Sequence, residues 1–122
     1  MTNKEIILAF VQRVFNEHRL DRVAEFMHED YIQHNPNVGT GRDAFVKAFE
    51  AHFARQPLFR MEIKHLIAED DFVVVHAHAT SGVDDAGAAV ADIYRLRDGF
   101  LAEHWDVLQK VPESFVHANG MF

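Results

Sequence analysis

The chain has 122 residues, of which 48% are hydrophobic, and its formal net charge is −7. This length fits one domain with a core of its own, so we expect residues 1–122 to form a single domain. The acidic balance argues against nucleic acid and anionic membrane surfaces as partners, because both are bound by clustered Lys and Arg. Cysteine is absent, which excludes disulfides, cysteine-zinc sites and thiol nucleophiles.

The N-terminal residues lack a charged start followed by a long apolar run, so no signal peptide is predicted. No apolar stretch approaches the roughly 20 residues that a membrane-spanning helix needs. We therefore expect a cytoplasmic protein. Eleven Phe residues in so short a chain indicate an apolar interior that either encloses a cavity or is simply filled with Phe.

The first half of the chain has helical periodicity. Thr2 and Glu5 form a capping-box pattern, and the apolar residues that follow at helical spacing predict a helix to about Arg19. Asp21 can cap a second, short helix. After a loop at Gly39-Thr40-Gly41, a third amphipathic helix is predicted from about Arg42 to Ala54.

The second half has the alternation and β-branched content of strands. The predicted strands are 59–64, 72–80, 88–96 and 100–109, joined in meander order. Three helices followed by about four strands make an α+β layout. The expected architecture is a cone-shaped curved antiparallel sheet with the three N-terminal helices packed across its concave face, enclosing a pocket.

The last predicted hairpin is rich in polar side chains. A three-residue loop of Arg97, Asp98 and Gly99 would keep the even-numbered positions on one face. That face would carry the following side chains: Asp92, Tyr94, His104 and Asp106. A two-residue Asp98-Gly99 turn would instead place Asp92 opposite Trp105. We adopt the three-residue loop because it gathers the polar groups on one side.

Two functions are open for this face. If it is buried, desolvation raises the pKa of a carboxyl there, which suits that group to take a proton next to a carbonyl. A neighbouring His or Tyr could then donate a hydrogen bond to the developing enolate. If the face is solvated, Asp92 and Asp106 only keep the sheet soluble.

Two further segments carry candidate residues. His76 and His78 point the same way on a strand, which is compatible with metal ligation, with the lining of a pocket or with an interface. A third metal ligand would come from this set: His34, Asp92, His104 or Asp106. The polar run Tyr31, Gln33, His34 and Asn35 before Pro36 indicates either a pocket rim or turn chemistry.

With these segments identified, the chain resembles the SnoaL-like branch of the nuclear transport factor 2-like superfamily over nearly its whole length. The resemblance lies in Tyr31-Ile32-Gln33-His34-Asn35-Pro36, Gly41-Arg42, Asp71-Phe72-Val73-Val74-Val75-His76, Asp92-Ile93-Tyr94-Arg95-Leu96 and Glu103-His104-Trp105-Asp106-Val107. It implies a curved-sheet cone that pairs as a homodimer through the sheets. Ile93, Trp105 and Val107 would then form the interface, with Arg95 and Glu103 available to pair.

The resemblance also implies a chemistry. SnoaL-type members close polyketide rings by intramolecular aldol condensation with an Asp general base and no cofactor. Asp106 matches that base, and Asp92 matches a position where some members have an assisting His. His104 and Tyr94 would orient the base or stabilise an enolate.

The expected ligand is a small apolar molecule that contains a carbonyl group. The residues expected to bind it are Tyr31, Gln33, His34, Asn35, His76, His78 and Tyr94. Because the superfamily places many reactions and some binding modules on one scaffold, two alternatives stay open. They are a small-molecule binding protein without turnover and a metal-dependent hydrolase or oxygenase that uses His76 and His78.

Overall fold

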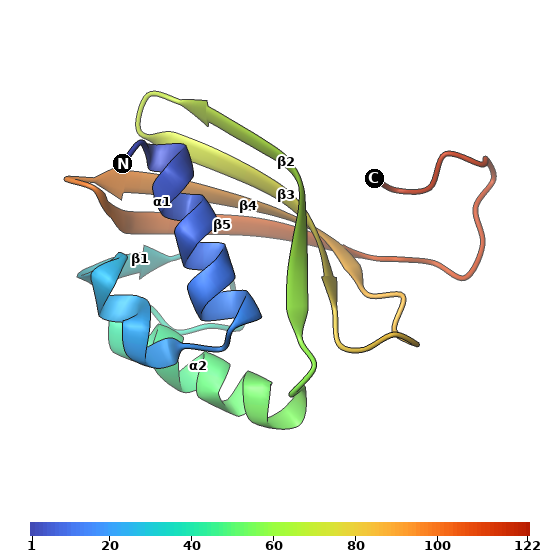
Figure 1. The fold of residues 1–122 in the computed structure, drawn as a ribbon, viewed down its shortest axis with the longest axis horizontal. Helices are drawn as coiled ribbons and strands as arrows, with labels where there is room; N and C mark the ends of the chain where they lie inside the picture. Colours follow the sequence, from blue (N-terminus) through green and yellow to red (C-terminus); the bar gives the residue numbers. More distant parts are fainter.

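The computed structural model describes all 122 residues, with the helices packed against one curved sheet (Figure 1). The helical elements are α1 (Asn3–Phe10), a π-helical continuation (Val11–Asn16), a 3-10 helix (Leu20–Glu25) and α2 (Arg42–Arg55). The strands are β1 (Met27–Gln33), β2 (Arg60–Glu69), β3 (Phe72–Thr80), β4 (Ala88–Arg97) and β5 (Phe100–Lys110). No helix combines the length and apolarity that crossing a membrane requires.

The first helix begins as predicted and ends earlier. The capping box is present, because the Thr2 hydroxyl accepts from the Glu5 backbone N–H at 3.2 Å and Glu5 accepts from the Thr2 N–H at 3.2 Å. The helix stops before Arg19 because His18 has a φ of 56° and leaves the helical path. The His18 ring stacks on Phe53 and bonds to the carbonyl of Phe59 at 2.7 Å, so a tertiary contact ends the helix.

The sheet has five strands in the order β1-β5-β4-β3-β2. Strands β2 to β5 form the predicted antiparallel meander, and β1 adds to β5 in parallel. The expectation of about four antiparallel strands is therefore one strand short. The missed strand is short, and only Met27 and Tyr31 are buried along it, so its periodicity is weak in the sequence.

The β4–β5 hairpin places the even-numbered side chains on one face, as predicted, but not through the predicted three-residue loop. Its turn has two residues, Asp98 and Gly99, with φ of 53° and 81°, the positive values that two-residue hairpin turns of type I′ require. Leu96 pairs with Leu101, but the next pair is Arg95 with Glu103, so Ala102 is an extra residue in a β-bulge. The bulge compensates for the shorter turn. Asp92 is paired with Asp106 and Tyr94 with His104, all facing the helices.

The core lies between the concave face and the helices. From the helices it takes Ile7, Phe10, Val14, Phe15 and Phe45, and from the sheet Val73, Val75, Tyr94 and Leu101. Phe10 is fully buried and contacts the rings of several other aromatic residues: Phe15, Phe26, Phe45 and Tyr94. The α+β cone with helices across its concave face is thus confirmed. Phe both fills this core and, as described next, lines a cavity beside it.

Candidate active site

A cavity of about 500 Å³ opens between α2 and the concave face of β4 and β5. Its walls are mostly apolar and include the rings of Phe15, Phe45, Phe49 and Phe59. This volume and this lining are typical of sites for small organic ligands, which present few polar groups on an apolar wall. Both alternatives for the Phe residues therefore hold, since some fill the core and others face open space.

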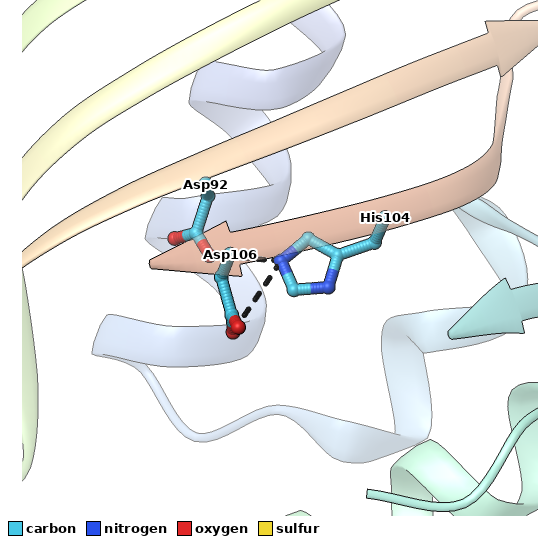
Figure 2. A group of neighbouring side chains, drawn as sticks. All are labelled: Asp92, His104 and Asp106. Carbon is cyan, nitrogen blue, oxygen red and sulfur yellow. Dashed lines mark hydrogen bonds and ion pairs between the residues drawn. The ribbon is translucent and has the colours of Figure 1, made fainter. Parts of the chain in front are cut away.

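Three side chains from β4 and β5 meet at the base of this cavity (Figure 2). His104 Nε2 lies 2.8 Å from Asp92 Oδ1 and 3.9 Å from Asp106 Oδ2. Asp92 and His104 are each only 6% exposed. They come together because the cross-strand pairs Asp92–Asp106 and Tyr94–His104 lie next to each other on one face of the hairpin.

Burial is the largest cause of the pKa shifts of Asp92 and of the two tyrosines beside it. Desolvation raises the pKa of Asp92, and the charge of Asp106 adds to the rise, whereas the hydrogen bond from His104 opposes it. Desolvation, followed by the charge of Asp92, raises the pKa of Tyr31 and of Tyr94 well above the ordinary value for tyrosine. Both phenols are therefore neutral hydrogen-bond donors at neutral pH.

Asp106 is held differently from Asp92. The Asn35 side-chain amide donates to both of its carboxylate oxygens, at 2.9 Å and 2.8 Å. Asn35 itself is oriented by its backbone N–H, which donates to Gln33 Oε1 at 3.0 Å. The Asp106 carboxyl group thus has a fixed orientation and lines the cavity.

The Tyr94 hydroxyl is a free donor next to the carboxyl groups of the site. It makes no hydrogen bond within the chain. Every fully enclosed side-chain oxygen or nitrogen of the protein, however, does have a hydrogen-bond partner. The hydroxyl must therefore reach open space, and the open space next to Tyr94 is the cavity. A ligand oxygen placed there would be its natural acceptor.

Seven of the residues predicted from the sequence line the cavity: Tyr31, Gln33, Asn35, Asp92, Tyr94, His104 and Asp106. They meet because β1 joins β5 in parallel, which places Gln33 opposite His104. The turn alternative for the segment before Pro36 also holds in part, since Asn35 Oδ1 accepts from the Asn37 N–H at 2.8 Å.

His34 is placed wrongly by the sequence prediction. It follows Gln33 directly on the strand and so points to the opposite, outer face of the sheet. Its ring stacks on Trp105 with 4.9 Å between centroids, and its Nε2 lies 2.7 Å from Glu103 Oε2. It therefore does not line the cavity.

His76 and His78 are also on the outer face, because the buried positions of β3 are odd-numbered. His76 Nδ1 bonds to His65 Nδ1 at 2.9 Å, and His78 Nε2 to the Ala86 carbonyl at 2.7 Å. Neither lines the cavity, which corrects their assignment as ligand-binding residues. The sheet also separates them from His104 and both aspartates, so a metal site shared with those residues is excluded.

The sequence analysis missed three polar residues of the cavity: Asn37, which follows the predicted segment before Pro36, and His52 and Arg55 of α2. His52 and Arg55 lie in the last turn of α2, and Arg55 is the one arginine or lysine that lines the cavity. Burial, and then the charge of Arg55, lowers the pKa of His52. The sequence did contain a pattern that could have identified His52, because Phe45, Phe49 and His52 recur at helical spacing and so share one face of α2.

One group of side chains has the composition of a small metal site. Asp92, His104 and Asp106 each offer one ligand atom, and these atoms all lie within 4.8 Å of one another. An imidazole nitrogen with two carboxylates suits several divalent cations. The same three groups also suit proton transfer, as developed below.

The comparisons with known proteins agree with this architecture. A candidate polyketide cyclase from Acidithiobacillus ferrooxidans superposes with a TM-score of 0.75 at 18% identity, over 88% of each chain. A candidate isomerase of the SnoaL-like family from Agrobacterium tumefaciens gives 0.75 at 20% identity, over 89% of this chain and 99% of that one. A nuclear transport factor 2-like protein of unknown function from Cytophaga hutchinsonii gives 0.73 at 14% identity, over 89% and 91%.

These identities establish a shared fold and leave the reaction open. Among curated proteins, none is detectably similar in sequence. The family model described as "SnoaL-like domain" matches residues 7–104, which is most of the chain and includes β1, the parallel strand that carries Tyr31 and Gln33. By this match and by its curved-sheet fold, the chain belongs to the SnoaL-like domain family.

Proposed function

We propose that this protein is a small-molecule enzyme that performs cofactor-free general acid–base chemistry next to a carbonyl group, as an aldol cyclase or a ketosteroid-isomerase-type isomerase. The observation that carries the proposal is the pairing of two differently held carboxyls at the base of an apolar cavity. Asp106 is oriented by Asn35 and lines the cavity, and Asp92 is buried against His104.

The reaction step follows from these environments. Asp106 accepts a proton from the carbon next to the carbonyl, and the electron pair of that C–H bond moves toward the carbonyl oxygen. The Tyr94 hydroxyl stabilises the enolate that forms by donating a hydrogen bond to its oxygen. In a cyclase the enol carbon then attacks a second carbonyl carbon, and the new alkoxide takes the proton from Asp106. An isomerase would return that proton to another carbon.

The substrate class follows from the walls of the cavity. Four Phe rings offer apolar contact area, and a volume near 500 Å³ suits a molecule of drug-like size. The ligand is therefore a small apolar carbonyl compound, bound with its carbonyl at the β4–β5 end.

The direct test is exchange of α-protons for deuterium in a panel of β-keto esters and enones, followed by NMR in deuterated water. The wild type should exchange at least one compound faster than buffer. Asp106→Asn should slow that exchange by about 10²–10⁴-fold, the usual contribution of a general base. Glu103→Gln, on the other face of the same strand, is the matched control and should exchange at the wild-type rate.

Retention of full exchange by Asp106→Asn would remove Asp106 as the base. Tight binding of a panel compound without any exchange would instead favour the alternative function, a binding protein without turnover. The same cavity serves that function, which needs no competent base.

We also propose that the protein pairs as a homodimer through the outer face of the sheet. Trp105 and Val107 on β5 and Ile93 on β4 all point to this face, and Val107 is 69% exposed. Phe72 and Ile67 extend the exposed apolar surface across β3 and β2. Apolar surface of this extent on a sheet is typical of an interaction surface.

A further inference from the structure

The direction of the hydrogen bond between Gln33 and His104 can be assigned from the positions of heavy atoms. Gln33 Oε1 accepts from the backbone N–H of Asn35 at 3.0 Å and from that of His34 at 3.1 Å. An amide NH₂ in that position would face two other donors, so the oxygen must occupy it. His104 Nδ1 lies 2.7 Å from the same oxygen. Since that oxygen only accepts, Nδ1 must carry a proton and donate it.

The other ring nitrogen, Nε2, is so close to an Asp92 oxygen that a further proton or a cation must lie between them. His104 Nε2 lies 2.8 Å from Asp92 Oδ1. With its proton on Nδ1, a neutral imidazole offers a lone pair at Nε2, and an ionised Asp92 offers lone pairs only. Two bare acceptors at this distance in a buried site would repel each other. One more proton must therefore lie between Nε2 and Oδ1.

We propose that Gln33 is a positioning residue which, by holding the Nδ1 proton, makes the Asp92–His104 couple store one exchangeable proton on the cavity side of the ring. From the sequence, Gln33 was expected to bind substrate directly. In the structure its carbonyl oxygen is already occupied by three donors, two from the backbone and one from His104. The effect of this oxygen on a reaction is therefore exerted through His104.

The groups around the couple favour retention of this proton. Asp106 on β5 brings a second carboxylate to 3.9 Å from Nε2. Tyr94 on β4 and Tyr31 on β1 lie with ring centroids 4.9 Å and 6.3 Å from the imidazole and stay neutral. His52 and Arg55 of α2 line the same cavity, and the positive charge of Arg55 acts in the opposite direction. Burial also raises the pKa of Asp92, which agrees with a proton at this position.

The use of the proton rests on the proposed function. When Asp106 takes a proton from carbon, negative charge develops on the carbonyl oxygen of the ligand. The couple can transfer its proton to that oxygen, and the enol O–H that forms then donates a hydrogen bond back to the couple, so that ionised Asp92 and neutral His104 do not face each other without a proton. The site would then hold a general base and a general acid on adjacent positions of one hairpin.

The test is NMR of the protein with ¹⁵N-labelled histidine, which reports separately whether each ring nitrogen carries a proton, and which needs no substrate. The His104 signals are assigned by comparison with His104→Gln. At neutral pH we expect Nδ1 to be protonated and Nε2 to be protonated or proton-sharing. A wild type in which Nδ1 lacks a proton, or in which Nε2 is a lone pair that accepts no hydrogen bond from a protonated Asp92, would overturn the proposal.

Two variants of Gln33 separate positioning from general structure. Gln33→Leu removes the acceptor, so the ring can move its proton to Nε2 and donate to an ionised Asp92. We expect Nδ1 to lose its proton in this variant. Gln33→Glu keeps an acceptor oxygen and should retain the wild-type pattern at Nδ1. Equal patterns in a folded Gln33→Leu protein and the wild type would overturn the positioning role.

A third variant keeps the test decisive if Gln33→Leu does not fold. In Asp92→Asn the amide NH₂ can donate to Nε2, so we expect a lone-pair signal at Nε2 with Nδ1 still protonated. A protonated Nε2 in this variant would overturn the assignment of the proton to the couple.

A divalent cation is the one other species that could lie between Nε2 and the carboxylates. The wild-type spectrum should therefore be the same before and after treatment with a chelator, and a change in the Nε2 signal would assign the position to a metal. Failure of the proton-exchange assay with Asp106→Asn would leave these spectra intact, so the two proposals can fail separately.

Discussion

The inner and outer faces of the sheet each carry a histidine hydrogen-bonded to a carboxylate, and the two pairs have nearly equal lengths. His104 and Asp92 are 2.8 Å apart on the inner face, and His34 and Glu103 are 2.7 Å apart on the outer face. The pKa of Asp92 is raised, mainly by burial, whereas that of Glu103 is lowered, mainly by the hydrogen bond from His34. Glu103 also accepts from Arg95 at 2.9 Å.

The chemistry of such a histidine–carboxylate pair therefore depends on its surroundings more than on its N···O distance. The outer pair is partly exposed and has a permanent cation beside it, so its carboxylate stays ionised. The inner pair is enclosed, and its second neighbour is another carboxylate, so it retains a proton. Only the inner face therefore has the arrangement that acid–base chemistry needs.

The largest expected contrast between the faces is in stability. Phe10→Ala removes a fully buried ring on the inner side and should lower the free energy of unfolding by about 3–5 kcal/mol, since it leaves a cavity. Phe72→Ala, whose ring is 41% exposed on the outer face, should cost under about 1 kcal/mol. Urea denaturation at one protein concentration measures both. Similar losses would show that the outer face is as well packed as the core.

Substitutions on the inner and outer faces should also differ in their effect on the rate of α-proton exchange. Tyr94→Phe removes a free donor from the cavity and should slow α-proton exchange by about 10²-fold, as loss of one oxyanion donor does. His76→Gln on the outer face is the control and should leave the rate unchanged. A Tyr94→Phe enzyme with the wild-type rate would leave the hydroxyl without a role in catalysis.

The carboxyl groups of Asp92 and Glu103 should make the free energy of unfolding depend on pH in opposite directions. A raised pKa means that folded Asp92 holds its proton more tightly than the unfolded chain does, so its ionisation costs stability as pH rises above about 4. The stability of Asp92→Asn relative to wild type should therefore increase over that range, by at most about 1.4 kcal/mol per pH unit. Thermal or urea unfolding across the pH range measures this.

Glu103→Gln should show the reverse behaviour. A lowered pKa stabilises the folded state above the unfolded pKa, and this stabilisation is lost as pH falls through the folded value. The variant should therefore be less stable than wild type at neutral pH and equal to it in acid. Slopes of the same sign for Asp92→Asn and Glu103→Gln would contradict the comparison of the two pairs.

The smallest effect on a single chain, and the sharpest test of the outer face, is expected from Val107→Asp. This position is largely exposed, so the substitution should change monomer stability by about 0.5 kcal/mol or less. In the proposed dimer it would bury a charge and should prevent association. Light scattering after size exclusion should give a dimer for wild type and a monomer for the variant. A wild-type monomer at micromolar concentration would contradict the dimer.

The sequence by itself determined the elements and the family. Apolar spacing and capping identified the helices near their observed positions, and alternation located β3, β4 and β5 to within a residue or so. These patterns are local, because each reflects one face of one element. The residues Asp92, Tyr94, His104 and Asp106 could be placed on a common face for the same reason, since side chains alternate along paired strands.

The tertiary structure alone decided which face is enclosed and how the register arises. The bulge at Ala102 compensates for a turn shorter than expected, and nothing local in the sequence marks it. The parallel pairing of β1 with β5 brings Gln33 to His104 across 71 residues of chain, which no periodicity can indicate. His34, His76 and His78 resemble site residues in sequence, but strand alternation places them outside the cavity. Protonation depends on burial and on distant neighbours, and folding creates both.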